Sequence, residues 1–114
     1  MTDVIENSGL TWAPAVPPSD LEEFGVAAAM VGGLKVALYA VDGEYYATAD
    51  LCTHGQASLA DGFLDGELIE CPLHQGTFNV KTGAAVGAPC SVAVRTFPVK
   101  LEGGLLHVGL PGAA

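Results

Sequence analysis

Two short segments that each join a cysteine to a histidine constrain this chain more than any other feature of its sequence. The first is CTHG, residues 52–55, and the second is CPLHQG, residues 71–76, and sixteen residues separate the end of the first Cys-His pair from the second cysteine. Each segment follows a predicted strand, so two loops can close on one site from opposite sides. A fold that does this gathers four metal-binding side chains.

The four side chains, Cys52, His54, Cys71 and His74, fit two kinds of metal centre. One is tetrahedral zinc, and the other is a [2Fe–2S] cluster in which two histidines replace two cysteines on one iron. Zinc sites of this composition usually place like ligands together in one turn. Here each loop supplies one cysteine and one histidine, which favours the two-iron cluster. Structural zinc stays open as the alternative.

The remaining sequence predicts many short strands and no long helix. The paired residues Gly32-Gly33, Asp42-Gly43 and Gly103-Gly104 are typical of tight hairpin turns. A single helical turn is expected in SDLEEF, with Ser19 as its N-cap, and residues 51–66 and 86–90 are expected to be loops. Strands are expected at residues 25–30, 35–41, 45–49, 67–71, 77–80, 91–102 and 105–110. This pattern indicates an all-β barrel or sandwich.

Length and charge limit the class of protein further. The 114 residues suffice for a single domain, 1–114, and three cysteines are an odd number that argues against a disulfide framework. Thirteen acids against four bases, a formal net charge of −9, disfavour binding to nucleic acid. Seven acids and no base lie between residues 42 and 70. They predict either a solvated surface or a face that docks a basic partner.

The N-terminal and apolar segments predict a cytoplasmic protein without a membrane span. MTDVIENSGL carries acids and lacks the basic and apolar regions of a secretory signal. The most apolar stretch, residues 25–41, is short, is broken by glycines and contains Lys35.

At the two Cys-His pairs the sequence resembles the Rieske proteins, whose ligand pattern is Cys-x-His followed by Cys-x-x-His. The stretch LCTHGQASLADGFLDGELIECPLHQGTFNVKTGAAVGAP is similar to the cluster-binding region of small ferredoxins from bacterial aromatic ring-hydroxylating dioxygenase systems, most closely the naphthalene and biphenyl types. The resemblance covers about residues 34 to 110. It implies a Rieske fold, an antiparallel β-sandwich or barrel base with a small cluster-binding subdomain of two ligand loops, roughly residues 50–90.

The resemblance also implies a role for each ligand. Cys52 and Cys71 would hold the inner iron of one Rieske-type [2Fe–2S] cluster, and His54 and His74 would hold the outer iron. Pro89 matches a proline-containing loop that covers the cluster in the family. The third cysteine, Cys90, is expected to be a small hydrophobic residue.

The function implied is that of a one-electron carrier in aromatic hydrocarbon catabolism. It would take electrons from an NAD(P)H-dependent, flavin-containing ferredoxin reductase and pass them to a Rieske-type terminal oxygenase. No catalytic residue is predicted, and the chain has no GxGxxG or GxxxxGK motif that would bind a nucleotide. The chain is therefore expected to be an electron-transfer component and not an enzyme. The alternative is a Rieske-like small subunit bound permanently to another redox enzyme, such as nitrite reductase.

Overall fold

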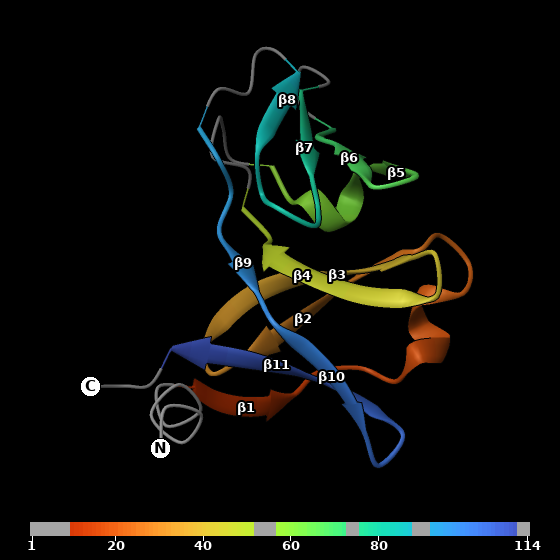
Figure 1. Ribbon diagram of the computed structural model, residues 1–114, viewed down its shortest axis with the longest axis vertical. Helices are drawn as coiled ribbons and strands as arrows, with labels where there is room; N and C mark the ends of the chain where they lie inside the picture. Colours follow the sequence, from red (N-terminus) through yellow and green to blue (C-terminus); the bar gives the residue numbers. More distant parts are fainter. Residues whose placement is uncertain (1–9, 52–56, 73–75, 88–91, 112–114) are drawn as a thin grey trace.

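Three antiparallel sheets stack along the long axis of the molecule, which measures 43 × 29 × 24 Å (Figure 1). The computed structural model describes residues 10–51, 57–72, 76–87 and 92–111. The lower sheet has the order β1-β11-β10, the middle sheet β2-β3-β4-β9 and the upper sheet β5-β6-β7-β8. The predicted all-β architecture of antiparallel sheets is confirmed.

The bounds of the elements are as follows. The lower sheet contains β1 (Leu10–Pro14), β10 (Val99–Glu102) and β11 (Leu105–Pro111). The middle sheet contains β2 (Val26–Val31), β3 (Leu34–Val41), β4 (Glu44–Ala49) and β9 (Thr96–Phe97). The upper sheet contains β5 (Phe63–Asp65), β6 (Leu68–Glu70), β7 (Thr77–Asn79) and β8 (Ala85–Gly87). Two 3-10 turns, η1 (Pro18–Leu21) and η2 (Leu59–Asp61), connect them.

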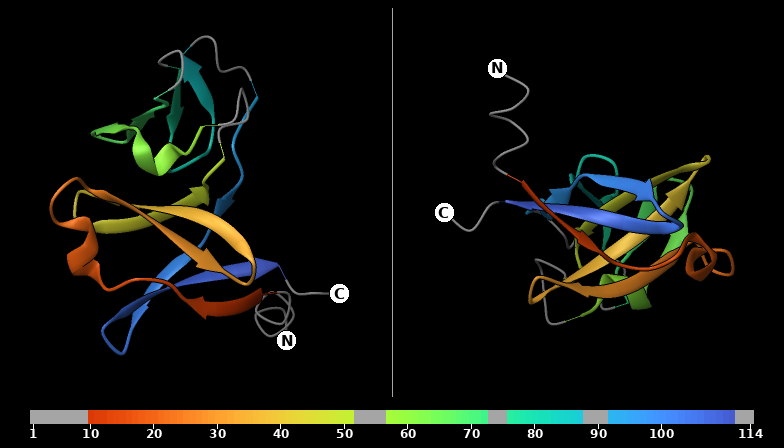
Figure 2. Two further views of the ribbon diagram at one scale, coloured as in Figure 1. Left: turned by 180° about the vertical axis from the view of Figure 1, so that it is seen from behind. Right: turned by 90° about the horizontal axis from the view of Figure 1, so that it is seen from below.

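Strand β3 is buried on both faces because it runs through the centre of the middle sheet. Its side chains alternate between two apolar clusters. Ala37, Tyr39 and Val41 join the cluster under the upper sheet, and Val36 and Leu38 join the cluster over the lower sheet. Seen from below in Figure 2, the lower sheet lies across the middle one. Among them, Val36, Leu38 and Val41 each contribute about 1.5–3 kcal/mol by their burial.

The three predicted hairpin turns are confirmed. Both residues of each pair have positive φ: 57° and 80° at Gly32-Gly33, 52° and 81° at Asp42-Gly43, and 62° and 83° at Gly103-Gly104. Two consecutive residues with positive φ form the turn whose twist matches that of paired strands. These turns fix the registers of β2 with β3, β3 with β4 and β10 with β11.

Several local predictions were wrong. Ser19 is not the N-cap of η1, because the turn begins with Pro18 at its first position and Pro17 precedes it without a side-chain cap. Residues 51–66 contain η2 and β5, and the segment predicted as a loop from residue 86 begins inside β8. The predicted strand 91–102 is divided at Pro98. Proline lacks the N–H of a ladder bond, so β9 pairs with β4 before it and β10 pairs with β11 after it.

In the part of the chain that the structure describes, no helix has the length and apolar character needed to cross a membrane.

Candidate metal centre

Cys71 lies at the foot of the second predicted ligand loop. It follows β6, is fully buried, and belongs to the same apolar cluster as Ile69 and Phe78. The N–H of Cys71 donates to the carbonyl oxygen of Gly76 at 2.7 Å, which closes the segment between them. The backbone of Cys71 is therefore held in place, and its thiol is shielded from water. His74, the other predicted ligand of this loop, lies outside the described residues.

The first predicted ligand loop is closed in a similar way. Leu51 and Ser58 form an isolated antiparallel bridge, and the N–H of Leu59 donates to the carbonyl oxygen of Asp50 at 2.7 Å. The side chain of Asp50 adds a further bond, because its Oδ1 accepts from the N–H of Ala60 at 2.9 Å. Cys52 and His54 themselves lie outside the described residues.

The bases of the two loops are in contact. Leu59, which follows the first loop, is buried in the same cluster as Cys71. Gly62 lies so close to the carbonyl oxygen of Glu70 that a Cβ at this position would overlap it. A cleft of about 230 Å³ runs between them and is lined by Asp61, Gly62, Phe63, Glu70, Cys71 and Pro72. The structure therefore brings the bases of the two segments together, and of the four predicted ligands it describes Cys71 alone.

The segment that follows β8 has its base on the same sheet. Gly87, the last residue of β8, lies against the side-chain oxygen of Thr77, directly after the second loop. On the return of the chain, the N–H of Val94 donates to the carbonyl oxygen of Gly83 at 2.8 Å. Pro89 and Cys90, whose roles were predicted from the sequence, lie outside the described residues.

Asp50 is a functional candidate that the sequence did not single out. It was counted among the acids of a surface run, but the structure buries it to 2% exposure. Its Oδ2 lies 3.5 Å from Nζ of Lys35, and the two side chains form an ion pair. The signal that could have found it is its place, since it directly follows the predicted strand 45–49 and lies two residues before Cys52.

A second buried polar pair lies beneath the site. The hydroxyl groups of Tyr39 and Thr48 are 2.9 Å apart, and Thr48 Oγ1 also donates to the carbonyl oxygen of Ala49 at 2.9 Å. Thr48 has one hydroxyl proton and donates it to the carbonyl oxygen of Ala49, so Tyr39 donates to Thr48. Burial raises the pKa of Tyr39 above its ordinary value, and the negative charge of Asp50 adds to this rise.

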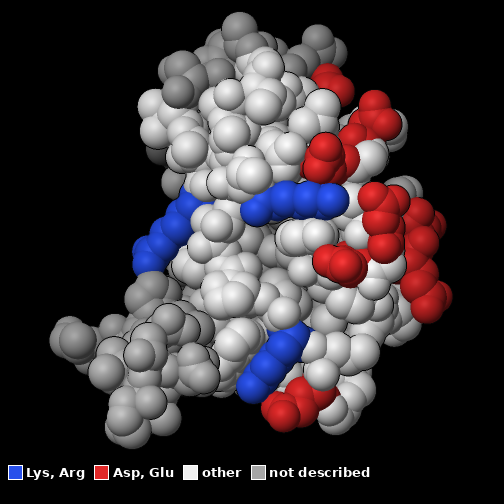
Figure 3. Space-filling model, viewed as in Figure 1, with Lys and Arg blue, Asp and Glu red and all other residues white. Residues whose placement is uncertain are grey.

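The remaining acids of the run form a surface. Asp61, Asp65 and Glu67 are exposed. Figure 3 shows acidic side chains gathered along the edge of the molecule where Figure 1 places η1, the β3–β4 turn and β5. Lys81 reaches this edge and lies 3.6 Å from Glu67. Both sequence-based interpretations, a solvated surface and a docking face, are compatible with this arrangement.

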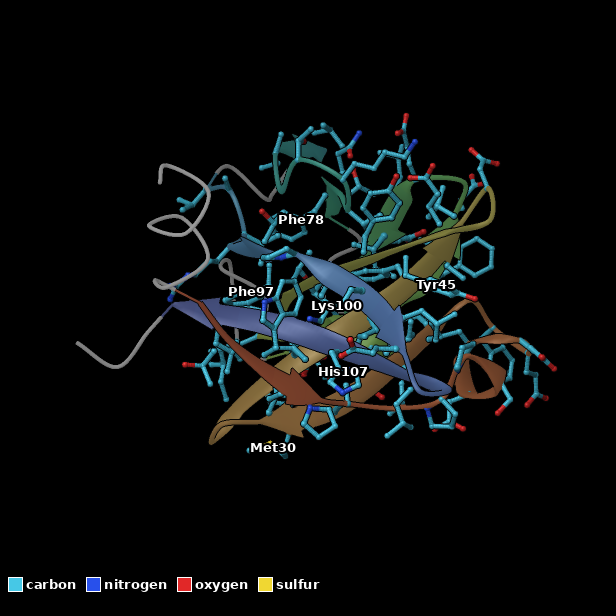
Figure 4. All side chains as sticks on the ribbon, turned by 60° about the horizontal axis from the view of Figure 1, so that its bottom comes forward. Met30, Tyr45, Phe78, Phe97, Lys100 and His107 are labelled. Atoms are coloured by element: carbon cyan, nitrogen blue, oxygen red, sulfur yellow. The ribbon has the colours of Figure 1, made fainter. Side chains whose placement is uncertain are left out.

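His107 is separate from the candidate site. It lies on β11 opposite Lys100 of β10, in the lower sheet (Figure 4). Its Nδ1 is 3.1 Å from the carbonyl oxygen of Leu105. Cys71, by contrast, is buried beneath the upper sheet among the side chains shared with the middle one.

Cys71, the one predicted ligand that the structure describes, suits a metal centre with thiolate ligands. A cysteine fixed by its own backbone at the foot of a closed loop can present its sulfur without reorganisation. The second loop base packs directly beside it. The chemistry of the four predicted ligands, two thiolates and two imidazoles, matches a two-iron cluster with mixed ligation.

A family model and a curated relative each match most of this chain. The family model for the Rieske [2Fe-2S] domain matches residues 11–98. The ferredoxin component of the naphthalene 1,2-dioxygenase system of Pseudomonas putida is 53% identical over 91 residues, which cover 80% of this chain and 88% of the relative.

Two solved structures are similar in fold. The ferredoxin of Sphingomonas yanoikuyae B1 has a TM-score of 0.82 and 37% identity, covering 89% of this chain and 100% of that one. A chain from a complex of reduced oxygenase and oxidized ferredoxin in carbazole 1,9a-dioxygenase has a TM-score of 0.77 and 42% identity, covering 85% of this chain and 91% of that one.

Proposed function

Because this chain belongs to the Rieske [2Fe-2S] domain family, we propose that it is a one-electron carrier of an aromatic ring-hydroxylating dioxygenase system. It takes electrons from an NAD(P)H-dependent flavin reductase and delivers them to a Rieske-type terminal oxygenase. The observation that carries the proposal is the 53% identity, over most of both chains, to a ferredoxin component of such a system. The chain is an electron-transfer component and not a catalyst.

The comparisons favour this function over that of a permanently bound nitrite reductase subunit. The relative named above is a ferredoxin component, and one structural neighbour is a ferredoxin in complex with its oxygenase. We place the carrier in the cytoplasm, where a reductase that uses NAD(P)H finds its reductant.

For the metal centre we propose the ligands Cys52, His54, Cys71 and His74, which suit one cluster. When bound, the cluster would take up and release a single electron. The chain's own contribution is to hold the ligands: Cys71 is fixed by its bond to Gly76 and shielded from water by burial. We further propose that residues 1–114 form one Rieske domain, whose cluster-binding part spans roughly residues 50–90.

The ligand assignment is tested by metal analysis of the purified protein. The unchanged chain should contain iron and inorganic sulfide in equal amounts and no stoichiometric zinc, with an axial low-g signal after reduction. Cys71→Ser should lose the iron and destabilise the loops, because metal binding and local folding are coupled. Cys90→Ser is the matched control and should keep the iron. Zinc in the unchanged chain, or full iron in Cys71→Ser, would contradict the assignment.

The carrier function is tested by reconstitution. The iron-loaded protein is mixed with NADH and with the purified reductase and terminal oxygenase of the naphthalene dioxygenase system. We expect the protein to be reduced by the reductase and reoxidised by the oxygenase in the presence of substrate and oxygen. A protein that carries the cluster but exchanges electrons with neither component would disprove the carrier function while leaving the metal centre in place.

A further inference from the structure

Asp50 is a buried acid whose backbone and side chain each make two polar contacts. Its carbonyl oxygen accepts from the N–H of Leu59 at 2.7 Å and its N–H donates to the carbonyl oxygen of Lys35 at 3.1 Å. Its carboxylate accepts from the N–H of Ala60 at 2.9 Å and lies 3.5 Å from the Lys35 ammonium. A carboxylate is buried at a cost of several kcal/mol unless such partners compensate it.

These contacts connect three elements around one predicted ligand loop. Lys35 is the second residue of β3, Asp50 directly follows β4, and Ala60 lies in η2. The two ends of the segment that contains Cys52 and His54 are therefore joined by Asp50, and the bridge between Leu51 and Ser58 adds to this closure. Without the carboxylate, η2 would be held at the end of β4 only by the backbone bond from Leu59 to Asp50 and by this bridge.

The ion pair is unequal in its exposure to solvent. The side chain of Asp50 is 3% exposed and that of Lys35 is 53% exposed. Water screens the ammonium but does not reach the carboxylate, so the negative charge acts on the interior more strongly than the positive one. The raised pKa of Tyr39 agrees, because the charge of Asp50 adds to the larger effect of burial.

We propose that Asp50 is a positioning residue for the first ligand loop and that its carboxylate sets part of the electrostatic field at the metal centre. The inference rests on the proposed function, since it requires the cluster to be held by this loop. Asp50 precedes Cys52 by two residues, and the chain keeps their Cα atoms within about 7.6 Å of one another. At such a separation a buried charge is felt by the centre.

The direction in which each charge shifts the midpoint potential of the centre can be predicted. The reduced centre carries one more negative charge than the oxidised one, so a nearby carboxylate opposes reduction and an ammonium favours it. Asp50 should therefore lower the midpoint potential, and Lys35 should raise it by a smaller amount because it is half exposed. If the two residues had only a structural role, their substitution would not shift the midpoint potential in opposite directions.

The experiment separates the two roles by the choice of variant. Asp50→Asn removes the charge but keeps an oxygen that can accept from Ala60, so we expect full iron content, the same reduced signal and a higher midpoint potential. Asp50→Ala removes both, so we expect partial loss of iron and faster hydrogen exchange at the Ala60 amide. The matched control is Asp65→Asn, an equal charge change at an exposed site, which should leave the potential close to that of the unchanged protein.

Lys35→Gln completes the test, because it should lower the potential, and the double variant Lys35→Gln/Asp50→Asn should lie between the single ones. Iron-loaded Asp50→Asn with the potential of the unchanged protein, or a shift no larger than that of Asp65→Asn, would overturn the field effect. Full iron and unchanged Ala60 exchange in Asp50→Ala would overturn the positioning role. Absence of a cluster in the unchanged chain would instead overturn the proposed function, so the failures are distinguishable.

Discussion

Tyr39 brings a phenol group into the core at the level of β3, and its hydroxyl depends on a single partner. It is the largest fully buried side chain in the described part of the chain. The hydrogen bonds run from Tyr39 to Thr48 and from Thr48 to the carbonyl oxygen of Ala49. Because no water reaches this position, loss of the partner cannot be compensated by solvent.

Thr48→Val should therefore destabilise the protein. The valine has nearly the same volume but cannot accept a hydrogen bond, so the Tyr39 hydroxyl is left buried and unpaired. We expect the free energy of unfolding, measured with urea, to fall by about 1–3 kcal/mol. The double variant Tyr39→Phe/Thr48→Val removes both polar groups and should recover part of the loss. A double variant less stable than Thr48→Val would contradict this explanation.

Tyr39 also predicts how stability depends on alkaline pH. Its pKa in the folded protein is raised, mainly by burial, above the ordinary value near 10 that it has when unfolded. Its contribution is complete below that value and is lost as pH rises toward the folded pKa, because the unfolded chain releases the proton first. We expect Tyr39→Phe to flatten the decline of unfolding free energy above about pH 10.

Tyr46→Phe is the control for that measurement. The pKa of Tyr46 is also raised, chiefly by its hydrogen bond to Glu44, but its side chain is solvated and the effect is screened. This variant should therefore keep most of the alkaline decline. An equal effect of both substitutions would assign the decline to tyrosines in general.

At the scale of elements, a strand could be predicted from the sequence when residues within it or in the adjoining turn specify it, and not when it depends on pairing with a neighbouring strand. The strands β2, β3 and β4 were predicted correctly because the turns at Gly32-Gly33 and Asp42-Gly43 delimit them locally. The three-residue strands β5 and β8 were missed, since each exists by pairing with β6 or β7 and has no pattern of its own.

The same distinction applies to the candidate site. The Cys-His spacing predicted the ligand loops, and the structure places Cys71 and the bases of both loops together. The burial of Asp50 could not be predicted, because it requires Lys35 and Ala60, which are remote in sequence, to meet around it.

Gly62 provides a test of how η2 is held against the end of β6. It has an extended backbone with φ of −86°, so an added methyl group causes no dihedral strain, but its Cβ would overlap the carbonyl oxygen of Glu70. Gly62→Ala should therefore separate η2 from β6. We expect the free energy of unfolding, measured with urea, to fall by about 1–3 kcal/mol, which is the usual cost of overpacking. The variant should also retain its iron less well.

Gly66→Ala is the matched substitution for comparison. Gly66 has φ of +63° and open space where its Cβ would lie, so alanine there adds only backbone strain of about 1–2 kcal/mol. We expect this variant to retain its iron fully. Iron retention that is equally poor in the two variants would show that the contact between Gly62 and Glu70 has no special role.

On the scale of the whole molecule, the stacked sheets place the candidate metal centre in one layer and an acidic edge beside it. A cleft of about 450 Å³ opens on that edge between η1 and η2. Phe24 and Phe63, which line it, are 73% and 65% exposed, and Glu23 and Asp61 lie next to them. Exposed aromatic rings bordered by acids suit a partner that offers an apolar side chain among lysines or arginines.

Reversal of charge on this edge should slow electron uptake from the flavin reductase. In Asp61→Lys/Asp65→Lys/Glu67→Lys we expect the second-order rate of reduction, followed by stopped flow, to fall by about tenfold at low ionic strength, because steering accounts for factors of this size. The difference should shrink as salt is added, since the Debye length falls to about 8 Å at 0.15 M.

Glu102→Lys serves as the control, because Glu102 ends β10 in the lower sheet and its reversal changes the net charge away from the cleft. It should have a much smaller effect on the rate at every salt concentration. Phe63→Ser should slow reduction by an amount that does not depend on salt, since it removes apolar contact and no charge. The loss of reduction rate is compared after division by the number of charges reversed in each variant. If this loss per reversed charge is equal in the triple variant and in Glu102→Lys, the acids contribute through net charge alone and the edge is a solvated surface.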